Sequence, residues 1–332
     1  MKKTLLALTV AAFTSFASFG AVAEYPEKEI QGVIAWGAGG STDTVMRSVT
    51  PHAEKELGGS VVMTNKTGGV GVIAAKFVQS QEADGYTLLM HAENPQLYKV
   101  MGLADFDYSD FTTVTLLARG TPVIVARNDA PYNTFKEFVE YAQANPKGVK
   151  VGSTGPGGLT SVVLAMLAAE NPMEFTNVPY DGDGPALTAL QGGAIDVMPA
   201  VLGAALEHIK AGRMKVLGLV NTEASPLVDA KPITEDYPAY AKYLPWGPFF
   251  GVFVKKGTPD DIVAKLTDAY EKGTQSDEFK KLMEERGFTI MATHGEEADE
   301  FLNRWQSVTS WLVHDAGAAK KSPEEFDIPK PE

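Results

Sequence analysis

The stretch Gln31–Asp43, with the sequence QGVIAWGAGGSTD, decides the fold of this chain. Its apolar run Val33–Trp36 predicts a buried strand, the glycines of Gly37–Gly40 predict a tight turn, and a helical pattern begins at Thr42. A strand, a glycine turn and a helix N-terminus in this order leave backbone N–H groups free at the positive end of a helix dipole. Such an arrangement is suited to binding an anion.

The same stretch also fits an ordinary strand-to-helix turn with Thr42 or Asp43 as the helix cap. No GK[ST] sequence follows the glycines, and this excludes a P-loop. The spacing G-x-G-G also differs from the G-x-G-x-x-G of dinucleotide-binding loops. One loop alone therefore leaves the anion site and the plain turn as open alternatives.

Three further units have the same order of strand, glycine turn and helix. They are a strand over Ser60–Thr64 with a helix over Val72–Gln79, a strand over Val149–Gly152 with a helix over Leu159–Glu170, and a strand over Asn177–Tyr180 with a helix from Pro185 to Gln191 capped by Asp183 or Gly184. Strands that alternate with helices at this spacing predict a parallel α/β sheet with functional loops at the carboxyl ends of the strands. In the first helix, Pro51 predicts a kink or an end at Thr50.

The N-terminal segment 1–23 has the features of a secretory signal peptide. Lys2 and Lys3 precede an apolar run, Leu5–Phe19, and Ala21–Ala23 has the small-x-small pattern of a cleavage site. The apolar run is short for a membrane span. The 332 residues include no cysteine, so a lipid anchor at the cleavage site and a disulfide are both excluded. We expect a chain exported to the bacterial periplasm that is not a lipoprotein.

The charge of the chain is strongly acidic, with a formal net charge of −13. The predicted signal peptide carries two of the lysines and no acidic residue, so the mature chain is more acidic still. This balance argues against nucleic acid and anionic membranes as partners. An anionic ligand would have to be held by local backbone dipoles against the overall field.

Two short segments predict where the chain passes between two domains. The first is Thr121–Pro122, and the second is the aromatic run Leu244–Val254. We expect one domain over residues 24–122 and 250–332 and another over 123–249. After the second crossing we expect helices, the first over Pro259–Gly273 with Thr258 as its cap. The aromatic side chains of the second crossing, Trp246, Phe249 and Phe250, fit a hinge core better than a ligand platform.

Two of the four units precede the first crossing and two follow it. Their helix N-termini can therefore converge on one cleft between the domains, where small-molecule sites tend to lie. Each helix end favours a negative group by roughly 0.3–1 kcal/mol. Two ends from each domain could bind both ends of a dicarboxylate without an arginine.

The chain resembles the extracytoplasmic solute receptors of tripartite tricarboxylate transporters, which are periplasmic binding proteins of the Bug or TctC type. Trp36–Asp43 resembles the family's aromatic–PGGxxD loop, and Asn65–Ala74 with Asp84–Leu88 resembles its NRPGAGGxIG…DGYTLL segment. The remaining matches are Gly152–Ser161 to ASSGxG, Val178–Gly182 with Pro185–Ala186 to VPYKGxxPA, and the segments Gly192–Asp196, His208–Gly212 and Gly257–Pro259. The matches cover essentially the whole mature chain.

This resemblance implies an α/β flytrap of two domains, each a sheet flanked by helices, which closes on a small organic acid and delivers it to a membrane permease. It implies a ligand site built from main-chain amides of the first loops and from the turns of the second domain. The expected ligand-binding residues are Trp36, Gly39, Gly40, Ser41, Thr42, Asp43, Gly68, Gly71, His91, Glu93, Ser153, Thr154, Gly157, Tyr180 and Asp181.

The sequence departs from the family pattern at three places. Gly37-Ala38 replaces a proline-bearing pair, Asp181 stands where Lys or Arg is common, and His91-Ala92-Glu93 stands where small hydroxyl residues are frequent. The last two changes add negative charge near the expected cleft. Asp43 could contact a ligand amine or hydroxyl or cap its helix, and His91 and Glu93 could bind their own loop instead of a ligand.

The sequence contains no HExxH motif, no GxSxG elbow and no Cys/His pair. We therefore expect a monomeric binding protein without enzymatic activity, metal or cofactor. One alternative is an exported hydrolase with Ser41 or Ser153 as nucleophile, for which only His91 lies near a strand end. Another is a ligand sensor that feeds a two-component system, which the sequence does not separate from a transport receptor.

Overall fold

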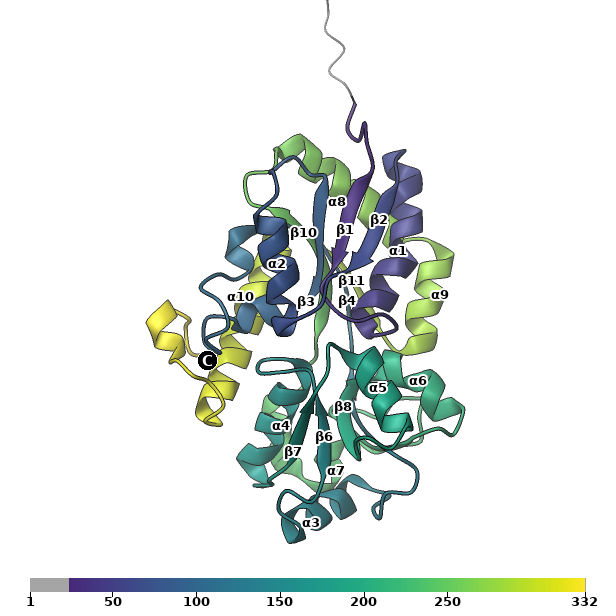
Figure 1. Cartoon of the computed structure of the whole chain (residues 1–332), viewed down its shortest axis with the longest axis vertical. Helices are drawn as coiled ribbons and strands as arrows, with labels where there is room; N and C mark the ends of the chain where they lie inside the picture. Colours follow the sequence, from purple (N-terminus) through teal and green to yellow (C-terminus); the bar gives the residue numbers. More distant parts are fainter. Residues whose placement is uncertain (1–23, 332) are drawn as a thin grey trace, which may run out of the picture.

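The computed structural model describes residues 24–331, and it shows two sheets that lie end to end, each flanked by helices (Figure 1). The predicted signal peptide, 1–23, lies outside the described residues. Among residues 24–331, no helix is both long enough and apolar enough to cross a membrane.

The first sheet has six strands in the order β11-β4-β10-β3-β1-β2. Its strands are β1 (Ile30–Ile34), β2 (Val61–Asn65), β3 (Thr87–Ala92), β4 (Phe111–Arg119), β10 (Phe249–Lys255) and β11 (Thr289–Thr293). The helices around it are α1 (Ser41–Leu57), α2 (Val72–Gln79), α8 (Asp260–Thr274), α9 (Asp277–Arg286) and α10 (Gly295–Asp315), with the short 3₁₀ helices η1 (Gly69–Gly71), η2 (Asn94–Leu97), η3 (Tyr108–Asp110) and η5 (Pro323–Phe326).

The second sheet has five strands in the order β7-β6-β8-β5-β9. Its strands are β5 (Pro122–Ala126), β6 (Lys150–Ser153), β7 (Thr176–Pro179), β8 (Val197–Val201) and β9 (Lys215–Leu219). Its helices are α3 (Phe135–Ala144), α4 (Leu159–Glu170), α5 (Asp183–Gln191), α6 (Leu202–Lys210), α7 (Ile233–Asp236) and the 3₁₀ helix η4 (Pro238–Tyr243).

The predicted strand–turn–helix units form the parallel part of each sheet. β1 pairs in parallel with β2 and β3, and β6 pairs in parallel with β7 and β8. The sheets are not wholly parallel, because β10 runs antiparallel to β3 and β4, and β5 runs antiparallel to β8 and β9. These two strands are the ones that enter each sheet from the other half of the molecule.

Four local predictions need correction. Of the two outcomes predicted at Pro51, the end at Thr50 is wrong. α1 continues through Pro51 to Leu57, because its packing on α8 outweighs one missing backbone hydrogen bond. α5 begins at Asp183 with Gly182 as its N-cap, two residues before Pro185.

The other two corrections concern the C-terminal part. The N-cap of α8 is Pro259, and the Thr258 hydroxyl instead donates a hydrogen bond to the carbonyl oxygen of Lys255 at 2.8 Å. β11 is an edge strand in a region where helices were expected, and its half-buried side chains give only a weak alternating pattern.

The two passages between the sheets lie side by side. Gly120, directly after β4, donates its N–H to the carbonyl oxygen of Pro248 at 2.9 Å, just before β10. The side chains of the second passage are core residues, as the sequence predicted: Trp246 donates to Thr309 at 3.0 Å, and Phe249 packs edge-on against Trp305. Only a few residues therefore connect the two halves at these crossings.

Candidate functional site

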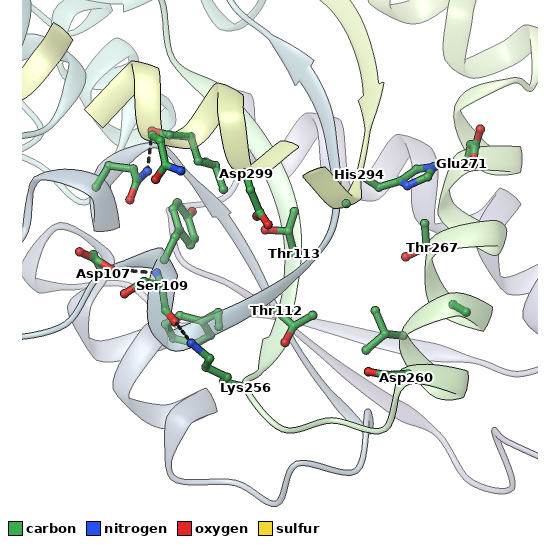
Figure 2. A pocket seen from close by; sticks show the side chains of 18 of the residues that line it. Asp107, Ser109, Thr112, Thr113, Lys256, Asp260, Thr267, Glu271, His294 and Asp299 are labelled. Carbon is green, nitrogen blue, oxygen red and sulfur yellow. Dashed lines mark hydrogen bonds and ion pairs between the residues drawn. The ribbon is translucent and has the colours of Figure 1, made fainter. Parts of the chain in front are cut away.

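A cavity of about 860 Å³ is lined by residues of the six-stranded half alone (Figure 2). All of its lining residues lie in the segments 96–113 and 256–306, so the second sheet contributes nothing to it. Its ionic groups are already paired in part, with His294 3.3 Å from Glu271 and the Lys256 ammonium donating to the Ser109 carbonyl at 2.8 Å. None of the fifteen site residues predicted from the sequence lines this groove.

A second cavity, of about 40 Å³, lies between the two sheets. It takes residues from both halves. Trp36, Gly40, Ser41, Thr42, Ala92, Glu93, Asn94 and Phe250 belong to the six-stranded half, Thr154, Leu159, Gly182, Asp183 and Val201 belong to the five-stranded half, and Pro248 lies at the crossing. Six predicted site residues come together here: Trp36, Gly40, Ser41, Thr42, Glu93 and Thr154. Phe250 lines the cavity as well as packing in the core.

Three helix N-termini that follow glycines meet at this cavity, and Val201, the N-cap of α6, lines it as well. α1, α4 and α5 begin after Gly40, Gly158 and Gly182, and none of these glycines can provide a side-chain cap. The N–H groups of a first helical turn have no partner within the helix, and they carry the positive end of its dipole. The fourth predicted N-terminus, that of α2, contributes no lining residue, because Gly71 packs against the imidazole of His91 instead.

Four buried polar atoms that belong to lining residues have no hydrogen-bond partner among residues 24–331. They are Trp36 Nε1, Glu93 Oε2, Asn94 Oδ1 and Thr154 Oγ1. Buried polar atoms in folded proteins are almost always paired, and each orphan is unfavourable by about 1–3 kcal/mol. Four of them around one small space indicate a site built to bind a polar ligand.

Two acidic side chains face the same space. Burial raises the pKa of Glu93 to about 8, and the negative charge of Asp183 acts in the same direction. Burial also raises the pKa of Asp183 to about 6, although the Ser41 hydroxyl, which donates to its carboxylate at 3.2 Å, opposes this shift. None of the described lining residues is a lysine, arginine or histidine.

The structure gives Asp43 a role inside its own loop. Its carboxylate accepts hydrogen bonds from the Gly39 N–H at 3.0 Å, the Arg47 guanidinium at 2.7 Å and the Asn65 amide at 2.9 Å. These three donors occupy both oxygens, and Asp43 does not line the cavity. Asp43 therefore stabilises the glycine turn through its hydrogen bond with the Gly39 N–H. Gly39 itself has φ of +76°.

His91 does not line the cavity but packs against Trp36, which does. Its Nδ1 accepts the Ala92 N–H at 2.7 Å, its Nε2 lies 3.0 Å from the Tyr98 hydroxyl, and its ring packs edge-on against Trp36. Complete burial lowers the pKa of His91 to about 3, so the ring is neutral at physiological pH. Neither serine of the hydrolase alternative pairs with it, since Ser41 bonds to Asp183 and Ser153 accepts the Gly155 N–H.

The remaining predicted residues do not line the cavity, and their contacts support the loops around it. Gly157 donates its N–H to Ser161 at 2.8 Å and accepts from the Asn94 amide at 3.2 Å. Tyr180 continues the pairing of β7 by donating its N–H to the Ser153 carbonyl at 2.8 Å. Gly68 is in a turn with φ of +116°, which favours glycine.

Asp181 joins the two halves across the rim. Its backbone carbonyl accepts the Gly37 N–H at 2.8 Å, and its carboxylate accepts the Thr67 hydroxyl at 3.1 Å. The Ser41–Asp183 hydrogen bond makes a third connection between the halves. Sequence reasoning missed Asp183 and Asn94, although an acid directly after the Tyr180–Gly182 turn and an amide beside Glu93 were visible signals.

Two α/β halves joined by short crossings and closed over a polar cavity define a solute-binding protein of the flytrap class. The model of the family described as "Tripartite tricarboxylate transporter family receptor" matches residues 45–313 of the chain. The chain belongs to this family and is a periplasmic solute-binding receptor of the Bug or TctC type, as its sequence motifs predicted.

Individual relatives resemble this chain in sequence or in fold. A Cupriavidus necator protein encoded in the gbd 5′ region is 30% identical over 264 residues, which are 78% of each chain. The structure of the periplasmic binding protein BugD is similar with a TM-score of 0.83 and 26% identity, over 89% of this chain and 99% of BugD. MatC from Rhodopseudomonas palustris, solved with bound malate, is similar with a TM-score of 0.77 and 26% identity, over 86% of this chain and 100% of MatC.

Proposed function

We propose that this protein captures a small organic acid in the cavity between its two sheets and delivers it to a membrane permease, without chemistry on the ligand. The observation that carries the proposal is the meeting of three uncapped helix N-termini with four unpartnered polar atoms. Helix N-termini bind carboxylates through free N–H groups and the dipole. The malate bound to MatC supports a carboxylate as the ligand.

We also propose that the chain divides into one domain of residues 24–122 and 250–332 and another of residues 123–249. A cavity of about 40 Å³ has room for one or two water molecules, so the halves must separate to admit an acid. The closely packed crossings at Gly120 and Pro248 are the natural hinge. We further propose that segment 1–23 is a cleaved signal peptide and that the protein acts as a monomer.

Small dicarboxylates and related organic acids are expected to raise the melting temperature, whereas neutral sugars are not. A ligand at one hundred times its dissociation constant adds about 2.7 kcal/mol to the free energy of unfolding. A thermal-shift screen of acids and sugars at equal concentration measures this. Stabilisation by sugars with no response to any acid would contradict the proposed function.

A further inference from the structure

The polar groups around the cavity divide into donors and acceptors. The donors are the first-turn N–H groups of α1 and the indole N–H of Trp36. The unpartnered acceptors are Glu93 Oε2 and Asn94 Oδ1, on residues that are only 2% and 1% exposed. Asn94 is oriented by its Nδ2, which faces two acceptors, Glu93 Oε1 and the Gly157 carbonyl, both at 3.2 Å. One part of the site therefore requires hydrogen-bond donors from the ligand.

Among residues 24–331, no lysine, arginine or histidine lines the cavity beside these acceptors. Asp183 on α5 adds a second carboxyl group, and the neighbouring His91 is neutral because burial lowers its pKa to about 3. Tyr98 and Tyr108 remain protonated, since burial raises the pKa of each well above its ordinary value. On α1 the charges of Asp43 and Arg47 pair with each other at 2.7 Å. Burying a carboxylate without a partner is strongly unfavourable, so free Glu93 is mostly protonated at pH 7, and a ligand cation would allow it to ionise.

We propose that the ligand carries a protonated amino group in addition to its carboxylate, and that Glu93, with Asn94 Oδ1 beside it, binds this ammonium. The inference rests on the proposed function, because it names the ligand class of the same cavity. The carboxylate lies at the helix N-termini and the ammonium at the acceptors, so the two charges of an amino acid match the two parts of the site. Glu93 acts here as a specificity-determining residue.

The first test uses two sets of matched probes in titration calorimetry at pH 7. Succinate, L-malate and L-aspartate share a skeleton and two carboxylates, and they differ only in a hydrogen, a hydroxyl or an ammonium. Propionate, L-lactate and L-alanine repeat the comparison with one carboxylate. In the set that fits the cavity, we expect the amino compound to bind roughly 10- to 100-fold more tightly than the unsubstituted acid, the range for a hydrogen bond to a charged group.

The outcomes separate this inference from the proposed function. Equal or tighter binding of succinate than of aspartate, with propionate likewise matching alanine, would overturn the inference and leave a carboxylate receptor. Failure of all six compounds to bind would overturn both.

The binding affinity should depend on pH with opposite signs for amino acids and for acids without an amino group. Burial raises the pKa of Glu93 to about 8 in the free protein, so raising the pH from 6 to 8 increases its ionised fraction. The affinity for L-aspartate should rise over this range and that for succinate should fall. Asp183, whose pKa burial raises to about 6, acts in the same direction. A parallel fall for both ligands would contradict the ammonium contact.

The variant Glu93→Gln keeps the size of the side chain and removes its charge. We expect the preference for the amino compound to shrink to less than threefold. Binding of L-aspartate to the wild type should release up to one proton, seen as different enthalpies in phosphate and Tris buffers, and the variant should release none. Glu207→Gln, at an exposed site on α6, is the matched control and should retain the preference. An unchanged preference in Glu93→Gln would overturn the proposal, and the wild-type pH series decides if the variant does not fold.

Discussion

Replacing Gly184 with alanine is expected to weaken ligand binding by roughly 10- to 100-fold while the protein stays folded, because overpacking typically costs about 1–3 kcal/mol. A Cβ atom at this position would overlap the carbonyl oxygen of Ala38 and lie 3.0 Å from the Gly40 nitrogen, both on the opposite half. This contact exists only when the two halves are closed. Gly184 is in the first turn of α5, where alanine is the better helix former, so the second half should not lose stability.

Titration calorimetry and small-angle scattering check the expectation for Gly184→Ala together. The wild type should become more compact with saturating acid, whereas the variant should keep a larger radius of gyration. Gly192→Ala, at the other end of α5, is the matched control, because the nearest atom to its added Cβ is 3.5 Å away. Wild-type affinity and compaction in Gly184→Ala would show that binding does not need this closed contact.

The substitution Gly40→Val is expected to reduce binding at least a hundredfold, which corresponds to about 2.7 kcal/mol. The Gly40 backbone is extended, with φ of −81°, so the reason is space and not conformation. A Cβ atom there would lie 3.3 Å from the Gly37 carbonyl oxygen and 3.4 Å from the Gly184 nitrogen, and the valine methyl groups would fill the gap between the N-termini of α1 and α5.

Calorimetry on Gly40→Val should show no measurable heat with acids that saturate the wild type, and its unfolding should remain cooperative. Ala38→Val is the control, because the side chain of Ala38 is exposed beside the same turn. Full-strength binding by Gly40→Val would place the ligand away from this loop.

The local units could be predicted from the sequence because their signals are local. The helices α2 and α4 have the predicted bounds, since a glycine turn marks the start of each and the apolar run stops at its end. The strand β11 was missed because an edge strand with half-buried side chains has little hydrophobic alternation. The direction of β10 depends on the return from the other half, and no short segment encodes that.

The sequence could predict which loops form the site, but not which of their side chains line the cavity and which support the loops. Gly40, Ser41 and Thr42 follow directly from the glycine turn. The placement of Asp43 depends on Asn65, a residue 22 positions away whose amide donates a hydrogen bond to one of the Asp43 carboxylate oxygens. The burial of His91 depends on tertiary packing. Asp183 faces the cavity only because α5 begins two residues earlier than Pro185 suggested.

The indole N–H of Trp36 provides the most direct measurement of the central claim. The chain has four tryptophans, and the other three indoles donate to Thr309, the Gly247 carbonyl and the Ile328 carbonyl. Trp36 Nε1 is the one without a partner among residues 24–331, and its residue lines the cavity.

A proton–nitrogen NMR titration therefore reports on the site through a single resonance, assigned by its loss in Trp36→Phe. We predict that a stabilising organic acid shifts the Trp36 indole resonance downfield to saturation, with the same dissociation constant as calorimetry, while the Trp311 resonance stays in place. Calorimetric binding that leaves the Trp36 resonance unmoved would contradict a ligand held between the two sheets.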